Sequence, residues 1–165
     1  MHDAKNAGTT RPRVRIARVA DYLETLPILQ EWFETKCESY YGPHGPGDAE
    51  KDLLSYANRG ELPIALVAFL EDELCGIAAL TSESIPTHAQ LCPWAAAGLV
   101  SPPHRRKGIG AQRLSAREEV ARTLRYPRID CGTSTAGDLL HRSGWPFLER
   151  VNSNGDAVSI DHKVL

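Results

Sequence analysis

The sequence has little net charge and no long apolar run. Its 165 residues carry 19 Lys and Arg against 21 Asp and Glu, which gives a formal net charge of −2. A chain without a basic excess lacks the global field that attracts nucleic acid. A membrane-spanning helix needs about 20 apolar residues, and no window approaches that length. We therefore expect no nucleic-acid partner and no membrane partner, and we expect a cytoplasmic protein.

Cysteine pairs at metal-binding spacing are also missing. Cys37, Cys75, Cys92 and Cys131 are separated by 38, 17 and 39 residues and form no C-x-x-C motif. This spacing does not resemble a zinc ribbon, so we expect no metal. Three of the four cysteines lie in apolar segments, which favours buried reduced thiols over disulfides.

The first twelve residues contain no apolar stretch of the kind found in a signal peptide. We interpret residues 1–12 as a flexible N-terminal tail. No repeat, low-complexity segment or linker divides the rest of the chain, so we expect residues 13–165 to form a single domain.

Apolar runs and turn signals predict seven strands. The charged turn Glu71-Asp72-Glu73 would join the second and third strands into a hairpin, and Asn154-Gly155 would join the last two. We expect the fourth strand to be buried on both faces. The element order predicts a mixed sheet flanked by helices. The expected strands cover residues 14–18, 63–69, 74–80, 94–100, 129–133, 146–150 and 157–164.

Two helices are expected before the first hairpin. We assign Asp21 as the N-cap of the first, in which Pro27 marks either a kink or a second start. Residues 40–47, rich in Gly, Pro and Tyr, are expected to form an irregular loop. Asp48 would cap the second helix, which would run to about Asn58. Its inward residues would be Leu53, Leu54 and Ala57.

Two further helices are expected in the second half. One would run from about Ile109 to Arg125. The other, capped by Ser134 or Thr135, would have about eight residues and end with Gly144 at the C′ position. Trp32, Trp94 and Trp145 are expected in the core.

A basic, glycine-rich turn lies between the fourth strand and the next helix. It reads Arg105-Arg106-Lys107-Gly108-Ile109-Gly110-Ala111 and follows Ser101-Pro102-Pro103. The N–H groups of a helix N-terminus point outward and its dipole favours negative charge, while glycines let an anion approach the backbone. The order strand, basic turn, helix therefore predicts an anion site suited to a pyrophosphate.

Other interpretations of this turn are weaker or fail on spacing. Gly108 and Gly110 could serve only to allow a tight turn between strand and helix. A Walker A loop needs Gly-x-x-x-x-Gly-Lys-[Ser/Thr], which the chain lacks. A Rossmann turn needs Gly-x-Gly-x-x-Gly, and Arg113 occupies the place of the third glycine.

With a second motif downstream, the sequence resembles the Gcn5-related N-acetyltransferase (GNAT) superfamily. The signature [Arg/Gln]-x-x-Gly-x-[Gly/Ala] is matched by Arg105, Gly108 and Gly110, and residues 133–145 resemble the short helix that ends in Gly-[Phe/Trp]. The resemblance implies an α/β (α+β) fold. Its mixed, mostly antiparallel central sheet would have about six to seven strands, flanked by about four helices.

The resemblance also implies acetyl-CoA as co-substrate. The pyrophosphate would lie on backbone amides from about Arg106 to Ala111, and the pantetheine arm would pair with the splayed end of the fourth strand. One N–H of that strand would hold the oxyanion of the tetrahedral intermediate. The implied cofactor-binding residues are Leu99, Val100, Arg105, Arg106, Lys107, Gly108, Ile109, Gly110, Ala111, Ala136, Leu139 and Leu140.

The general acid and base are not evident from the sequence. Many family members carry a general-acid Tyr at the position of Leu140, which cannot donate a proton. His141 or Ser134 could substitute, as could a water. Glu83 or His88 could act as base from the acceptor side, since residues 94–100 contain no carboxylate.

The resemblance implies direct transfer of acetyl to a primary amine of a small molecule or peptide. Acidic residues of the first half favour a cationic acceptor: Glu31, Glu34, Glu38, Asp48, Glu50 and Asp52. The stretch from Glu31 to Gly42, with Tyr40 and Tyr41, could form an aromatic wall for the acceptor instead of packing in the core. A non-catalytic CoA-binding regulatory or sensor module is the alternative, suggested by Leu140 and the missing strand carboxylate. The sequence leaves open whether a longer acyl chain is transferred and whether the chain forms a homodimer.

Overall fold

The computed structural model describes residues 14–82, 84–101, 103, 109–133, 137–153 and 156–165. The expected tail at residues 1–12 and most of the basic turn lie outside these ranges. Within them, no helix is long and apolar enough to cross a membrane.

Seven strands form one sheet in the order β1-β2-β3-β4-β5-β7-β6. Every neighbouring pair is antiparallel except β4 and β5, which are parallel. This confirms the mixed, mostly antiparallel sheet that the sequence predicted. The strands are β1 (Val14–Arg18), β2 (Ile64–Leu70), β3 (Glu73–Thr81), β4 (Trp94–Val100), β5 (Arg128–Thr133), β6 (Phe147–Ser153) and β7 (Asp156–Val164).

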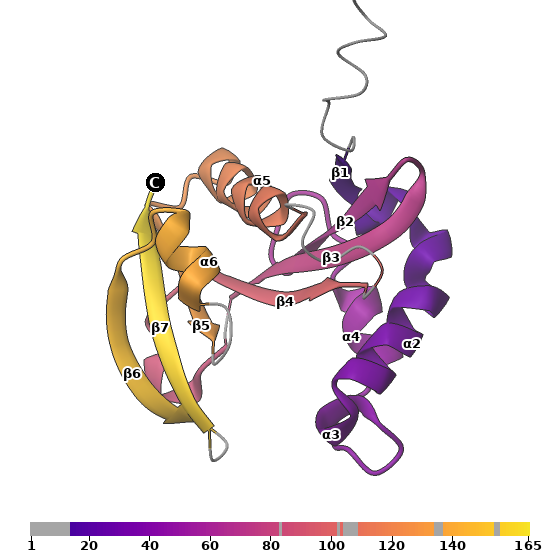
Figure 1. Ribbon diagram of the computed structural model, residues 1–165, viewed down its shortest axis with the longest axis horizontal. Coiled ribbons are helices and arrows are strands. Elements are labelled where there is room, and N and C mark those ends of the chain that lie inside the picture. The colour runs from indigo at the N-terminus through magenta and orange to yellow at the C-terminus, as the bar shows by residue number, and fades with distance from the viewer. Residues whose placement is uncertain (1–13, 83, 102, 104–108, 134–136, 154–155) are drawn as a thin grey trace, which may run out of the picture.

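Helices cover both faces of the sheet, as Figure 1 shows. Along β2, Val67 and Phe69 pack in the cluster that includes α2 and α4, whereas Ala68 and Leu70 pack with Ile109 of α5. This alternation follows from the two-residue period of a strand, since both faces of β2 are buried. The α-helices are α2 (Leu26–Lys36), α3 (Glu38–Tyr41), α4 (Ala49–Ser55), α5 (Ile109–Thr123) and α6 (Gly137–Arg142). Single 3-10 turns are η1 (Val19–Asp21), η2 (Leu23–Thr25) and η3 (Pro86–His88).

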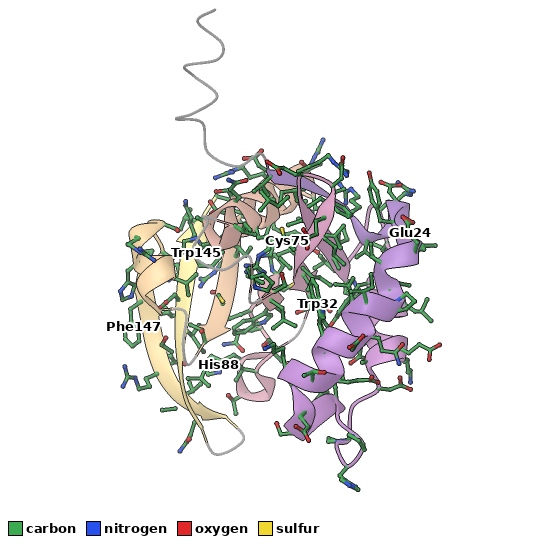
Figure 2. The ribbon with its side chains drawn as sticks, turned by 45° about the vertical axis from the view of Figure 1, so that its right-hand side comes forward. Glu24, Trp32, Cys75, His88, Trp145 and Phe147 are labelled. Carbon is green, nitrogen blue, oxygen red and sulfur yellow. The ribbon has the colours of Figure 1, made fainter. Side chains whose placement is uncertain are left out.

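The start of the first helix differs from the prediction. Asp21 ends the 3-10 turn η1 and caps no helix, while α2 begins at Leu26 with Pro27 in its first turn. Pro27 therefore marks a start rather than a kink, because a proline in the first turn has no N–H to leave unpaired. In Figure 2, Trp32 lies on the side of α2 toward the sheet and Glu24 points away.

The segment from α3 to α4 corrects two more expectations. Tyr40 and Tyr41 belong to the single-turn helix α3 and are not part of the irregular loop. Asp48 is the N-cap of α4, as predicted, and its Oδ1 accepts from the Lys51 N–H at 3.1 Å. However, α4 ends at Ser55, not near Asn58, and Leu54 does not point inward: it is 55% exposed, one helical step from the buried Leu53.

The first hairpin and the tryptophans follow the prediction closely. Glu71 and Asp72 both have positive φ, 50° and 68°, as the mirror-image turns of tight hairpins require, and Glu73 already belongs to β3.

Trp94 and Trp145 are fully buried, and Trp32 is partly buried against the cluster of α2 and α4. All four cysteines are free, although only Cys75 is fully buried.

Candidate functional site

A wedge opens between β4 and β5 in the middle of the sheet. The two parallel strands are in register only at Trp94 and Asp130, where the Asp130 N–H also donates to the Pro93 carbonyl at 3.0 Å. Beyond this point β4 runs toward α2 and α4, while β5 stays in the half that contains β6 and β7 (Figure 1). Among the described residues of β4 and β5, the ladder holds no further residue pair beyond Trp94 and Asp130, so the β5-facing edge of β4 opens from Ala95 onward.

A β-bulge lies in the open part of β4. Ile77 pairs with Leu99, and Ala79 pairs with Ala96. Ile77 and Ala79 are two residues apart on β3, whereas Leu99 and Ala96 are three residues apart on β4. The extra residue falls at Ala97-Gly98 and interrupts the regular ladder, which redirects backbone groups locally. Gly98 is exposed, and Leu99 and Val100 are half-buried, so the expectation that this strand is buried on both faces fails at its C-terminal half.

The N-terminus of α5 lies at the open end of this wedge. Ile109, the first helical residue, is 1% exposed and packs against Ala68, Leu70 and Cys75. This contact fixes the position of the helix, whose 15 residues give it a substantial dipole. Residues 104–108 of the basic turn lie outside the described residues, so their role in phosphate binding stays a prediction.

The short helix α6 closes the other side of the wedge and ends as expected. Gly144 has φ +83°, and the N–H of Trp145 donates to the Leu140 carbonyl at 2.9 Å, so the last turn is closed by a left-handed residue. Leu140 is 2% exposed and packs in the cluster of Leu114, Ala121 and Trp145. Its side chain therefore has almost no surface to offer a pantetheine arm, in contrast to the flanking role assigned to it. Ala136 and the side chain of Leu139 lie outside the described residues.

The three candidate catalytic residues are not brought together by any described contact. Glu83 and Ser134 lie outside the described residues. His141 is exposed on α6, next to the buried Leu140, as one helical step predicts. Burial raises the pKa of the Asp161 carboxyl, and the nearby His141 partly offsets this effect.

His88, the second candidate base, is already engaged. Its Nε2 pairs with Oε1 of Glu149 on β6, and its Nδ1 lies 2.8 Å from Oγ1 of Thr87. Figure 2 shows it on the side of the molecule that holds β6 and β7. A proton-accepting role would require one of its two ring nitrogens to leave its present partner.

Carboxylates gather around the loop between α3 and α4. One hollow is lined by Glu34, Tyr41, Pro43 and Asp48, and a neighbouring one by Glu38 and residues of the same loop. The Tyr41 hydroxyl donates to Oδ2 of Asp52 at 2.7 Å. Burial and this hydrogen bond raise the pKa of Tyr41 well above its ordinary value.

Two buried arginines on α5 were missed by the sequence reasoning. Arg113 and Arg117 are 7% and 6% exposed and lie beneath β4. A signal for them exists in the sequence, because Ile109, Arg113, Arg117 and Ala121 recur every four residues and so share one helix face. In the described part of the chain, no group of three or more His, Cys, Asp or Glu could hold a metal ion.

Solved structures with the same fold were found by comparison. An aminoglycoside 6'-N-acetyltransferase complexed with coenzyme A has a TM-score of 0.73 at 14% identity, over 91% of this chain and 96% of that one. A GNAT-family acetyltransferase from Streptococcus pneumoniae has a TM-score of 0.65 at 18% identity, over 93% and 99%. The yncA protein of Salmonella typhimurium with its cofactor acetyl-CoA has a TM-score of 0.66 at 18% identity, over 94% of both chains.

Identities of 14% and 18% show only that these proteins have the same fold as this chain. The family is shown by the comparison with family models. A comparison with curated proteins found no match. The model of the acetyltransferase (GNAT) family, in contrast, matches residues 28–142, which is well over half of the chain. Together with the wedge, the bulge and the glycine-rich entry to α5, this match shows that the chain belongs to the GNAT family of acetyltransferases.

Proposed function

We propose that this protein transfers acetyl from acetyl-CoA directly to a primary amine of a small molecule or peptide. The observation that carries the proposal is the open edge of β4, with its bulge at Ala97-Gly98, which leads to the N-terminus of α5. Such an edge offers backbone N–H and C=O groups to an extended arm. Membership of an acetyltransferase family, and solved relatives with CoA or acetyl-CoA bound, support acetyl-CoA as the donor.

The cofactor would run along this edge. Its pyrophosphate would lie on the backbone amides from about Arg106 to Ala111, where the helix dipole favours negative charge. Arg105, Arg106 and Lys107 would add charge, and Gly108 and Gly110 would allow close approach. The pantetheine arm would pair with Leu99 and Val100. Ile109 would contribute its N–H alone, since its side chain is buried.

The reaction needs a neutral amine and a stabilised oxyanion. An alkyl ammonium has a pKa of about 10.4, so a base or a water chain must remove its proton. The amine nitrogen then attacks the thioester carbon, a β4 N–H donates to the oxyanion, and the C–S bond breaks. The CoA thiolate leaves and takes up a proton. We assign Glu83 as the candidate base and Ser134 or His141 as candidate proton donors, because Leu140 cannot serve.

A cationic amine fits the acceptor side best. The carboxylates of Glu34, Glu38 and Asp48 surround the hollows at α3 and would attract a positively charged acceptor. Aminoglycosides, polyamines and basic peptides carry such charge. The relative that is an aminoglycoside acetyltransferase supports testing amino sugars first.

The test measures acetyl-CoA-dependent release of CoA thiol with aminoglycosides, polyamines, amino acids and peptide N-termini as acceptors. Release with one class of amine is expected, and its product must carry the acetyl group on nitrogen by mass spectrometry. Strong thermal stabilisation by CoA with no release from any amine would instead favour the non-catalytic sensor module.

A further inference from the structure

The face of α5 that packs on the sheet carries two guanidinium groups in an otherwise apolar row. Ile109 and Ala121 at the ends of this row are 1% and 0% exposed. Arg113 and Arg117 between them are more than nine-tenths buried. Two leucine-sized residues would fill such positions at no electrostatic cost, so the charge requires an explanation.

Both groups lie directly beneath the bulge of β4. Arg113 Nη1 donates to the Ile77 carbonyl, and Arg117 Nη1 donates to the Ala96 carbonyl at 3.1 Å. A Cβ placed on Gly98 would lie 3.2 Å from Arg113 Nη1 and 3.8 Å from Arg117 Nη1. Arg117 is also close enough to Cys131 of β5 to lower the pKa of that thiol, although burial, the larger effect, raises it. The pair thus spans the wedge from the bulge toward the point where β4 and β5 meet.

Neither guanidinium has an acidic partner among the described residues. The Nε atoms of Arg113 and Arg117 are buried without a hydrogen-bond partner. Glu118 raises the pKa of Arg117 but forms its own ion pair with Lys163 at 2.8 Å. Burial, followed by the charge of Arg117, lowers the pKa of Arg113 to about 10, so it remains protonated at neutral pH.

Two other arginines in the same half of the chain, Arg122 and Arg128, have acidic partners. Arg128 meets Oδ1 of the buried Asp130 at 2.5 Å, and Arg122 lies 3.7 Å from Glu118. Two adjacent buried cations without a paired carboxylate are costly, because hydrogen bonds to the Ile77 and Ala96 carbonyls offset only part of their desolvation and mutual repulsion. An arrangement of this kind is suited to receive an anion from outside the chain.

The position of the pair indicates where that anion would come from. This inference rests on one part of the proposed function, the binding of a CoA thioester in the wedge, and it differs from the proposed function in the acyl group that is transferred. A CoA thioester whose pyrophosphate lay at the α5 N-terminus would run along the open edge of β4, from Val100 toward the bulge at Gly98. Both guanidinium groups have an Nη1 atom within 4 Å of where a Cβ on Gly98 would stand, so they lie at the bulge itself. An acyl chain that ends in a carboxylate would give these cations a charge-assisted hydrogen bond, whereas acetyl carries no charge to offer them.

We propose that Arg113 and Arg117 bind the terminal carboxylate of a dicarboxylic acyl-CoA, such as succinyl-CoA, and so determine donor specificity. The transfer step forms and breaks the same bonds as the acetyl transfer described above. The amine nitrogen bonds to the thioester carbon, the C–S bond breaks, and the acyl group keeps its free carboxylate. A cationic acceptor then becomes an anionic product.

The experiment measures equilibrium binding, so it needs no acceptor. Calorimetry compares CoA with non-hydrolysable thioether analogues of acetyl-CoA and succinyl-CoA. For the wild type we expect the succinyl analogue to bind about tenfold or more tightly than the acetyl analogue, the factor expected for a charged hydrogen bond. Arg117→Met and Arg113→Met should reduce this ratio to about one while CoA affinity is kept. Arg117→Lys should keep part of it.

Arg122→Met is the matched control, since it removes an exposed arginine from the same helix and should leave the ratio unchanged. Equal affinity of the wild type for both analogues would overturn the carboxylate site and leave the proposed function intact. A preference that survives in both methionine variants would overturn it too. If no CoA species bound at all, the proposed function would fail and the donor site with it.

Discussion

The hydroxyl of Tyr41 donates a 2.7 Å hydrogen bond to Oδ2 of Asp52 and so ties α3 to α4. The Tyr41 ring also lies 5.4 Å from that of Phe33 on α2. Three short helical segments are thereby held together at the edge of the acidic hollows. These contacts fix one wall of the hollows to which the proposed function assigns a cationic acceptor.

Removing this hydroxyl should loosen the acceptor side. Tyr41→Phe keeps the ring contact and leaves Asp52 without its donor, so we expect the free energy of unfolding to fall by about 1 kcal/mol. Tyr40→Phe is the control, because Tyr40 is exposed. Urea denaturation of both variants measures the difference. Equal stability of the two would show that the bond contributes nothing.

The same tyrosine predicts a loss of stability in alkali. Its folded-state pKa is raised above the ordinary value of 10.0, chiefly by burial and then by the hydrogen bond to Asp52. Above about pH 10 the unfolded chain loses this proton and the folded chain keeps it. The stabilisation is therefore complete below about pH 10 and falls as pH rises further. Between about pH 8 and about pH 10.5, the wild type should lose more unfolding free energy than Tyr41→Phe. The same loss in both proteins would assign the effect to other groups.

Close approach of β3 and β4 depends on Gly76. A Cβ at this position would lie 3.0 Å from the Leu99 carbonyl oxygen, and that oxygen belongs to backbone that can move only with its strand. We expect Gly76→Ala to cost about 1–3 kcal/mol in unfolding free energy, as overpacking does. Gly60→Ala, where a Cβ would meet nothing within 4 Å, should change little. Thermal and urea unfolding of the two variants measure this difference in stability. Equal unfolding midpoints would show that β3 and β4 do not approach closely at Gly76.

Neighbouring residues on α6 should differ sharply in their effect on stability. Leu140 is 2% exposed within the core, so Leu140→Ala should cost about 2–5 kcal/mol. His141 is exposed, and His141→Ala should stay within about 0.5 kcal/mol of the wild type. The comparison uses urea denaturation. A small cost at Leu140 would mean that its side chain faces the wedge after all.

Local patterns were sufficient for most of the fold. Alternating or continuous apolar residues placed β1 and β4 at their observed bounds, and Asp48 caps α4 because a short acidic side chain can reach the N–H groups of a first turn. The rule that glycine and proline mark irregular loops failed where it was extended to the neighbouring tyrosines. Tyr40 and Tyr41 stand next to a Gly/Pro-rich loop, yet they complete a helical turn that the packing of Tyr41 on Phe33 supports.

The candidate site depended on the family resemblance and on contacts between distant residues. The pairing of β4 and β5 at a single register position joins residues far apart in sequence, and no periodicity encodes where two strands separate. Arg113 and Arg117 were missed because arginine is ordinarily a surface residue. Only their four-residue spacing from Ile109 and Ala121 reveals that they lie on the buried face.

The central claim, that acetyl-CoA binds at the N-terminus of α5, is tested most directly by calorimetry on Gly110→Asp. A carboxylate there would stand where the pyrophosphate should lie, so we expect the affinity for acetyl-CoA to fall by at least about tenfold, as for the loss of about 1.4 kcal/mol. Ser115→Asp adds the same charge to an exposed position of the same helix and should bind like the wild type. If Gly110→Asp, folded by circular dichroism, bound acetyl-CoA as tightly as Ser115→Asp, the cofactor would lie elsewhere and the account would be wrong.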